Sequence, residues 1–196
     1  MRNSKKMIGL VFAFFICTAF TTLGRSSVAQ IPPLVDFKEV IKLETKIEKV
    51  TINPELLQSH NNFLHAIGRR ESSNRYDITN RFGYMGKYQF GRKTLNSIGF
   101  KHIDNKTFLN SPKLQEEAML SLLKSNKKIL RRQIKRYVGT VVNGVYITES
   151  GLLAGAHLAG AGNVKKWLRN GKRFKDGLGT SIVSYIELFG GYKLNI

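Results

Sequence analysis

The sequence has almost no cysteine, since Cys17 is the only one among 196 residues. Cys17 lies within an apolar N-terminal run, and Phe15 and Ile16 stand where a lipoprotein signal would carry small residues. We therefore expect Cys17 to be removed with a signal peptide, which leaves a mature chain without a thiol. This excludes cysteine nucleophiles and structural disulfides, so the stability of the fold must come from packing.

Acidic residues are also scarce, with 13 Asp and Glu against 32 Lys and Arg. Four of the bases and none of the acids fall within residues 1–29, so 28 bases and 13 acids remain after them, a net charge of +15. Such a surface attracts polyanions. For an exported protein we expect anionic cell-wall polymers as possible partners; the simpler explanation is that the charge only provides solubility and loose surface adhesion.

Several catalytic and metal-binding patterns are missing as well. The four histidines form no zinc-protease motif. No Gly-x-Ser-x-Gly motif and no phosphate-binding loop occurs. The basic stretch at residues 124–136 lacks the interleaved aromatic residues of many nucleic-acid binders. We therefore expect no metal, no other cofactor and no nucleic-acid partner.

An export signal opens the chain. A basic start, an apolar run over residues 7–23 and the small-x-small site Ser27-Val28-Ala29 are typical of a secretory signal peptide at residues 1–29. We expect cleavage after Ala29 and a secreted or periplasmic protein. The alternative is an uncleaved membrane anchor, which is disfavoured because the run is short and contains several threonines. No later segment is apolar enough to span a membrane, so no stable span is expected after cleavage.

The remaining chain divides into a leader at residues 30–52 and one domain at residues 53–196. Asn53-Pro54 is typical of a helix start, with Asn as N-cap and Pro at the first helical position. Apolar or inward-facing residues then recur at helical spacing. They are Leu56, His60, Phe63 and Ile67. Four residues further the same face reaches Glu71.

Further elements are predicted along the domain. Glycines at positions 83, 86 and 91 predict turns or a small sheet. Asn143-Gly144 between β-branched residues predicts a hairpin or tight turn. Residues 124–136 are predicted to form a basic helix with an apolar stripe of Ile129, Leu130 and Ile134, and residues 152–159 a central buried helix. Helix starts are predicted at Ser111-Pro112, Thr148, Asn163 and Ser181.

Glu71 is the candidate catalytic acid. A glycosidase needs a carboxylic acid that protonates the leaving glycosidic oxygen. An ordinary glutamate is ionised at neutral pH, so we expect the site to raise the pKa of Glu71 by desolvation. A position on the inward face at the end of a helix provides such desolvation. The alternative is an exposed Glu71 that pairs with a neighbouring arginine, such as Arg69, Arg70 or Arg75.

Three short motifs follow one another in order: Glu71-Ser72-Ser73, GYMGKYQF at residues 83–90, and AHLAGAGNVKKWL at residues 156–168. Together they resemble the lytic transglycosylases of the soluble (SLT) type and their lysozyme relatives, over roughly residues 63–192. The resemblance implies a mainly α, lysozyme-like α+β fold with a substrate groove and a small irregular or β segment. It implies peptidoglycan glycan strands as the substrate and Glu71 as the catalytic acid, supported by a hydrogen bond from Ser72.

The resemblance also implies a substrate-binding role for Met85 and Gln89 in the groove, and for Tyr185 near the glutamate. The sequence departs from the family pattern at two places. His157-Leu158 replaces a tyrosine and an asparagine, and Lys87-Tyr88 replaces an apolar pair. For His157 we prefer a satisfied core histidine to a sugar contact.

The number of catalytic carboxyls decides the product. Hydrolytic glycosidases usually pair two carboxyls, and Asp77 is the nearest candidate in the sequence for a second carboxyl facing the cleft. Glu149 is interpreted as a charge at a helix start. The resemblance implies instead a lone glutamate that acts first as acid and then as base on the sugar's own 6-hydroxyl. We therefore predict a lytic transglycosylase that cleaves the MurNAc–GlcNAc β-1,4 bond and leaves 1,6-anhydro-MurNAc ends. A hydrolytic muramidase and a non-catalytic wall- or polyanion-binding protein are the alternatives.

Overall fold

The computed structural model describes residues 54–196 apart from 173 and 178. The predicted signal peptide, the leader and the N-cap Asn53 lie outside these residues. The described chain is mainly helical with one small antiparallel sheet, so the predicted fold class is confirmed. None of its helices has the length and apolarity needed to cross a bilayer. Its elements are α2 (Pro54–Ser72), α3 (Arg92–Ser97), α4 (Asn105–Leu109), α5 (Pro112–Tyr137), β1 (Val141–Val142), β2 (Val145–Tyr146), α6 (Glu149–Ala159), α7 (Ala161–Asn170) and α8 (Ile182–Leu188).

Helix α2 ends next to the predicted catalytic residue. Its predicted inward face is buried at His60, Phe63 and Ile67. Phe63 packs edge-on against Phe189 and Tyr192, with ring centroids 6.4 and 5.6 Å apart. These contacts tie α2 to the C-terminal part of the domain and so help to set the position of Glu71.

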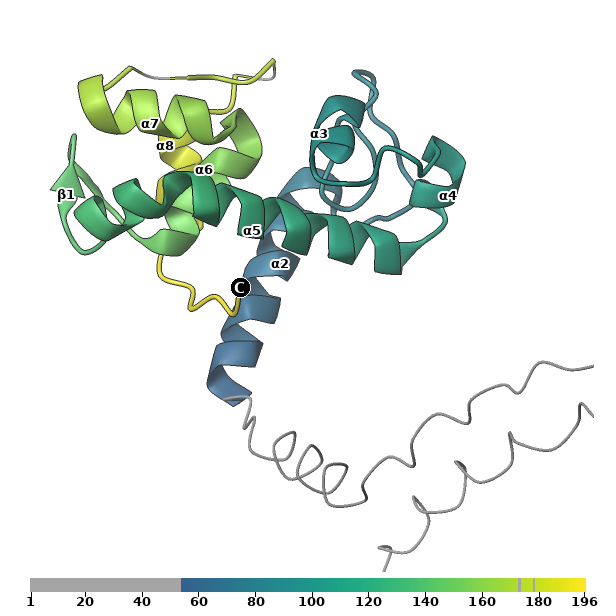
Figure 1. The fold of residues 1–196 in the computed structure, drawn as a ribbon, viewed down its shortest axis with the longest axis horizontal. Coiled ribbons are helices and arrows are strands. Elements are labelled where there is room, and N and C mark those ends of the chain that lie inside the picture. The colour runs from purple at the N-terminus through teal and green to yellow at the C-terminus, as the bar shows by residue number, and fades with distance from the viewer. Residues whose placement is uncertain (1–53, 173, 178) are drawn as a thin grey trace, which may run out of the picture. The chain divides into compact units, whose positions relative to one another are not determined.

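Helix α5 is the long central helix, and other elements of the domain lie along it (Figure 1). Its start is the predicted one, since the Ser111 side chain accepts a hydrogen bond from the backbone N–H of Leu114 at 3.3 Å. Helices α3 and α4 lie along its first half, and α6, α7 and the hairpin lie along its second half (Figure 1). The basic residues 124–136 belong to this same helix. Within the predicted apolar stripe, Leu130 is buried, whereas Ile129 is 49% exposed and lines the cleft described below.

Helix α6 is the predicted buried helix, and it packs against α8 through glycine. Thr148 caps it by accepting a hydrogen bond from the N–H of Gly151 at 3.1 Å. A Cβ atom on Gly151 would lie only 2.4 Å from the carbonyl oxygen of Ile186, and one on Gly155 only 2.9 Å from the Ile186 side chain. Because no side chain fits there, α8 approaches the α6 backbone closely, and this approach fixes the position of Tyr185.

The turns follow the glycine and asparagine signals. Asn143 and Gly144 have φ angles of 51° and 83°, as the predicted two-residue hairpin between β1 and β2 requires. In the glycine-rich segment before α3, Met85 forms isolated bridges with Thr79 and Phe90, which confirms the predicted turns and small β segment. Helices α3 and α4 were not predicted. They are six and five residues long, which is too short for an apolar period to show in the sequence.

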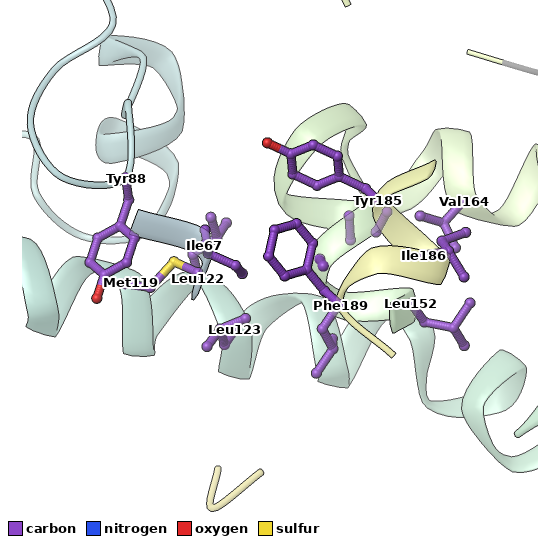
Figure 2. Close-up of a cluster of buried hydrophobic side chains, with 14 of the residues drawn as sticks. Ile67, Tyr88, Met119, Leu122, Leu123, Leu152, Val164, Tyr185, Ile186 and Phe189 are labelled. Atoms are coloured by element: carbon purple, nitrogen blue, oxygen red, sulfur yellow. The ribbon is translucent and has the colours of Figure 1, made fainter. Parts of the chain in front are cut away.

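The core consists of two groups of side chains joined across α5, as Figure 2 shows. One group contains Ile67, Tyr88 and Met119, and the other contains Leu152, Val164 and Ile186. Leu123 and Phe189 lie between them (Figure 2). Tyr185 stands at the edge of this core, with its ring centroid 5.0 Å from that of Phe189 and its hydroxyl directed away from the other side chains (Figure 2).

Candidate active site

Glu71 lies in the last turn of α2 and lines a cleft of about 780 Å³. Its side chain is 17% exposed. The Tyr185 hydroxyl donates a hydrogen bond to Glu71 Oε1 at 2.6 Å. The structure therefore brings α8 and α2 together at the place that the resemblance implied, and one carboxylate oxygen is held in a fixed direction.

His157 on α6 is the second side chain that faces Glu71. Its Nε2 atom is 3.5 Å from the same oxygen, and its side chain is only 6% exposed. The ring packs edge-on against Phe90, with centroids 6.1 Å apart. Nδ1 is buried and has no hydrogen-bond partner among the described residues. The interpretation of His157 as a satisfied core histidine is therefore wrong, because it lines the cleft and one of its nitrogens has no partner.

The pKa of Glu71 departs from the expectation. Burial raises it, as we expected, and the charge of Asp176 acts in the same direction. The contacts with His157 and the hydrogen bond from Tyr185 lower the pKa and outweigh burial, so the pKa of Glu71 lies below its ordinary value. The prediction of a raised pKa is thus wrong for the resting site, where Glu71 is a carboxylate. Burial and the nearby carboxylate raise the pKa of Tyr185, which therefore remains a hydrogen-bond donor.

Three parts of the chain line the cleft around Glu71. They are the glycine-rich segment with α3, the middle of α5, and the corner between α6 and α7 with the turn at Asp176. Phe82 and Tyr84 on the first part are 51% and 45% exposed, so they present aromatic surface at the cleft, and the Arg81 guanidinium lies over the Phe82 ring at 4.9 Å from its centroid. Asn126 on α5 is 5% exposed, and its Nδ2 has no partner within the described residues. The cleft thus combines aromatic surface with polar groups that have unused hydrogen-bonding capacity.

Two predicted site residues lie in the interior rather than in the cleft. Met85 is 2% exposed and belongs to the core. Ser72 is buried, and its hydroxyl donates to the carbonyl oxygen of Lys87 at 2.8 Å. The resemblance implied a hydrogen bond from Ser72 to Glu71, but the Ser72 hydroxyl bonds this carbonyl oxygen instead. Ser72 thus joins the end of α2 to the glycine-rich segment and helps to fix the position of each relative to the other.

The other two predicted residues differ in their position. Gln89 lines the cleft, as expected. Asp77 does not line it: its side chain is 71% exposed and pairs with Arg75 at 3.3 Å. The second carboxyl that does line the cleft is Asp176, which no sequence signal indicated. Its Oδ1 accepts a hydrogen bond from the backbone N–H of Thr180 at 2.7 Å.

The departure at Lys87-Tyr88 has a structural explanation. Glu116 on α5 accepts hydrogen bonds from Lys87 Nζ at 2.7 Å, from the Tyr88 hydroxyl at 2.6 Å and from the Tyr76 hydroxyl at 2.6 Å. Burial raises the pKa of Glu116, but these three donors outweigh burial and hold the pKa below its ordinary value. Neither Lys87 nor Tyr88 lines the cleft. Together with Glu116 they fasten the glycine-rich segment to α5.

The family model described as "Transglycosylase SLT domain" matches residues 54–178, which covers α2 through the cleft turn at Asp176. The chain belongs to the SLT transglycosylase family. SLT transglycosylases cleave glycosidic bonds of peptidoglycan, so this domain acts in the periplasm or outside the cell. Tyr185 lies beyond the matched residues and is placed at Glu71 by the structure alone. No curated protein and no solved structure matches the chain significantly. The described residues contain no cluster of three or more His, Cys, Asp or Glu suited to a metal ion.

Proposed function

We propose that this SLT domain cleaves the MurNAc–GlcNAc β-1,4 bond with Glu71 as its only catalytic carboxyl. In the first step, protonated Glu71 gives its proton to the glycosidic oxygen while the C1–O bond breaks. In the second step, the Glu71 carboxylate takes the proton of the MurNAc 6-hydroxyl while O6 bonds to C1 and closes a 1,6-anhydro ring. The observation that carries the proposal is the position of Glu71, partly buried in the cleft with one oxygen oriented by Tyr185.

The first test is the Glu71→Gln substitution. The amide keeps the size of the side chain and can still accept the Tyr185 hydrogen bond, so we expect a folded protein. Loss of general acid catalysis should lower the rate about 10²–10⁴-fold. The measurement is the clearing of purified cell walls, with circular dichroism as the control for folding. Near-wild-type clearing by this variant would refute the role of Glu71, and a wild-type protein that binds walls without clearing them would favour a non-catalytic binding protein.

The rival reaction is hydrolysis, which needs a second carboxyl. The position of Asp77, exposed and paired with Arg75, does not favour it for this role. Asp176 lines the cleft and is therefore the better candidate for the hydrolytic alternative. With Glu71 acting alone, Asp176→Asn and Asp77→Asn should each retain most of the activity. An inactive Asp176→Asn enzyme, with reducing ends in the wild-type products, would support the muramidase instead.

A second proposed interaction is with anionic wall polymers along α5. Its second half carries exposed bases on one broad face: Lys124, Lys128, Arg131, Arg132, Lys135 and Arg136. Lys127 differs from them, because its ammonium group pairs with Glu149 at 2.9 Å and donates to the carbonyl oxygen of Ile196 at 3.1 Å. The exposed bases offer solvent-accessible cations to a polyanion, whereas Lys127 joins α5 to α6 and to the C-terminus.

Export by a signal peptide that is cleaved after Ala29 also remains a proposal. The support is the basic, apolar and small-x-small pattern of residues 1–29 together with a peptidoglycan substrate. Mass spectrometry of the protein recovered from outside the cytoplasm should give an N-terminus at Gln30. An intact N-terminus in the membrane fraction would show an anchor instead.

A further inference from the structure

We propose that the β1–β2 hairpin, together with the basic helix ends beside it, forms a surface that binds anionic phospholipid membranes. This binding is separate from the cleavage reaction at Glu71, because neither Val141 nor Tyr146 of the hairpin lines the cleft. A lipid bilayer fits this surface because exposed apolar side chains and a large excess of positive charge occur together there.

The positive charge of the chain is concentrated in one part of the domain. Residues 118–175 contain 13 Lys and Arg and a single acid, Glu149, so this segment carries +12 of the net +15 that remains beyond residue 29. Glu149 pairs with Lys127 at 2.9 Å, which leaves the other bases without an acid from this segment. The segment comprises most of α5, the hairpin, α6 and α7, and these three helices pack against one another (Figure 1). This part of the domain is therefore strongly cationic.

The hairpin presents two exposed apolar side chains on one face. Val141 and Tyr146 are directly opposite each other in the antiparallel register, so their side chains project from the same face. They are 66% and 61% exposed, whereas Val145, which alternates with Tyr146 along β2, is 4% exposed and belongs to the core. Val138, directly after α5, is a third exposed apolar residue, at 42%. The hairpin thus offers apolar surface to a partner within the cationic part of the domain.

Exposed bases from two helices lie close to the hairpin. Lys135 and Arg136 are exposed in the last turn of α5, which ends shortly before β1. At the hairpin tip, the Asn143 side chain donates a hydrogen bond to the carbonyl oxygen of Trp167 in α7 at 3.4 Å, and Arg169 is exposed two residues further along α7. Cationic groups are therefore available to lipid phosphates when the apolar pair enters the headgroup region.

The combination of charge and apolar surface favours a bilayer over other partners. Wall polymers and nucleic acids attract a basic surface mainly through their charges, and an exposed valine adds little to such contacts. A second copy of this chain carries the same excess of positive charge, so two such surfaces repel each other. At a bilayer, tyrosine and aliphatic side chains enter the headgroup boundary while lysine and arginine contact the phosphates.

The test is cosedimentation of the chain without residues 1–29 with vesicles of phosphatidylcholine, either alone or with about 30% phosphatidylglycerol. We expect binding to the anionic vesicles only. The double variant Val141→Thr with Tyr146→Thr keeps residues that favour β-strands, and its affinity for the anionic vesicles should fall about tenfold or more. Its clearing of purified cell walls should equal that of the wild type, which also shows that the variant is folded.

A second measurement reports insertion of the hairpin directly. Tyr146→Trp keeps an aromatic side chain with a polar edge, and Trp167, the only tryptophan of the wild type, is 1% exposed. Anionic vesicles should therefore shift the emission of this variant to shorter wavelength, because the introduced indole leaves water. A bound variant with unshifted emission would show that the charges alone hold the domain at the surface, which would overturn the role of the apolar pair.

The matched control is Leu188→Gln. Leu188 is 59% exposed and also lies near bases, since it lines a different hollow together with Arg69 and Arg70 of α2. Its replacement should leave vesicle binding unchanged. The proposed surface would be refuted by a wild type that does not bind anionic vesicles, by a double variant that binds them as well as the wild type, or by an equal loss in the control. None of these results bears on Glu71, whose role is tested by wall clearing.

Discussion

Glu116→Gln should destabilise the domain strongly although Glu116 is remote from the reaction. The change removes the carboxylate that pairs with the Lys87 ammonium group at 2.7 Å, and it weakens the bonds from Tyr76 and Tyr88. Removing one partner of a buried ion pair costs about 3–5 kcal/mol. Since the Glu116 side chain is 34% exposed and that of Lys87 only 10%, we expect a value near the lower end, about 3 kcal/mol.

The assay is thermal unfolding of the wild type and three variants. A loss of about 3 kcal/mol corresponds to a fall in Tm of about 6–12 °C for a domain of this size. Lys87→Met should cost less, because Glu116 keeps its two tyrosine donors and some contact with water. The double variant should lose at least 1 kcal/mol less than the sum of the two single losses, because the buried charge is then removed together with its partner.

The pH dependence supplies a second check on the same pair. The pKa of Glu116 is lower in the folded state than its ordinary value, so its contribution to stability is present above the unfolded-state pKa of about 4.3 and is lost as pH falls through the folded-state value. The difference in stability between wild type and Glu116→Gln should therefore shrink below about pH 4. Strictly additive losses in the double variant, or a difference that is independent of pH, would refute the reasoning.

Three further predictions concern the site and the surface. Tyr185→Phe removes the 2.6 Å hydrogen bond to Glu71 and should lower kcat about tenfold or more with little change in KM, which steady-state kinetics on soluble glycan will show; an equal rise in KM would contradict a purely orienting role. Gly86→Ala places a methyl group 2.0 Å from the Gln115 side chain at a φ of +71° and should cost more than about 2 kcal/mol in chemical denaturation, so a neutral result would refute the close approach. Wall binding should weaken as the salt concentration rises, and Gln substitutions at four exposed bases of α5 should make binding less dependent on salt than Lys127→Gln does. If both variants show the same dependence of binding on salt, the exposed bases of α5 are ordinary solvated surface. The four positions are Lys124, Lys128, Arg131 and Arg132.

The sequence predicts those parts of the fold that depend on local signals. The stripe that leads to Glu71 repeats over several helical turns, and the caps at Ser111 and Thr148 and the Asn143-Gly144 turn each require only neighbouring residues. The order of the three motifs was enough to identify the family, as the match over residues 54–178 shows. These features hold because each depends on a short stretch of chain.

The composition of the site could be predicted only in part, because it depends on contacts between distant segments. Asp77 is close to Glu71 in the sequence, but Ser73 and Asn74 adopt positive φ angles of 56° and 62°, and after this turn the Asp77 side chain is 71% exposed. His157 reaches Glu71 only because α6 and α2 meet in three dimensions. The sequence signal for this contact is the His157-Leu158 pair of the third motif, which departs from the family pattern.

Local sequence signals did not predict the short helices α3 and α4 or the position of Asp176 in the cleft. An element of five or six residues has too few positions to show a period. Asp176 follows no motif, and its place in the cleft depends on how the turn before α8 folds, with the Asp176 N–H donating to the Thr180 carbonyl oxygen at 3.0 Å. Tertiary packing decides such positions.

The most direct test of the account is mass spectrometry of the muropeptides that the purified domain releases from cell walls. If Glu71 acts alone as acid and then as base, the sugar's own 6-hydroxyl closes the ring, and the products end in 1,6-anhydro-MurNAc without a reducing end. Each such product is one water lighter than the corresponding lysozyme product. Products with reducing ends would show that water is the nucleophile and would contradict the single-carboxyl mechanism.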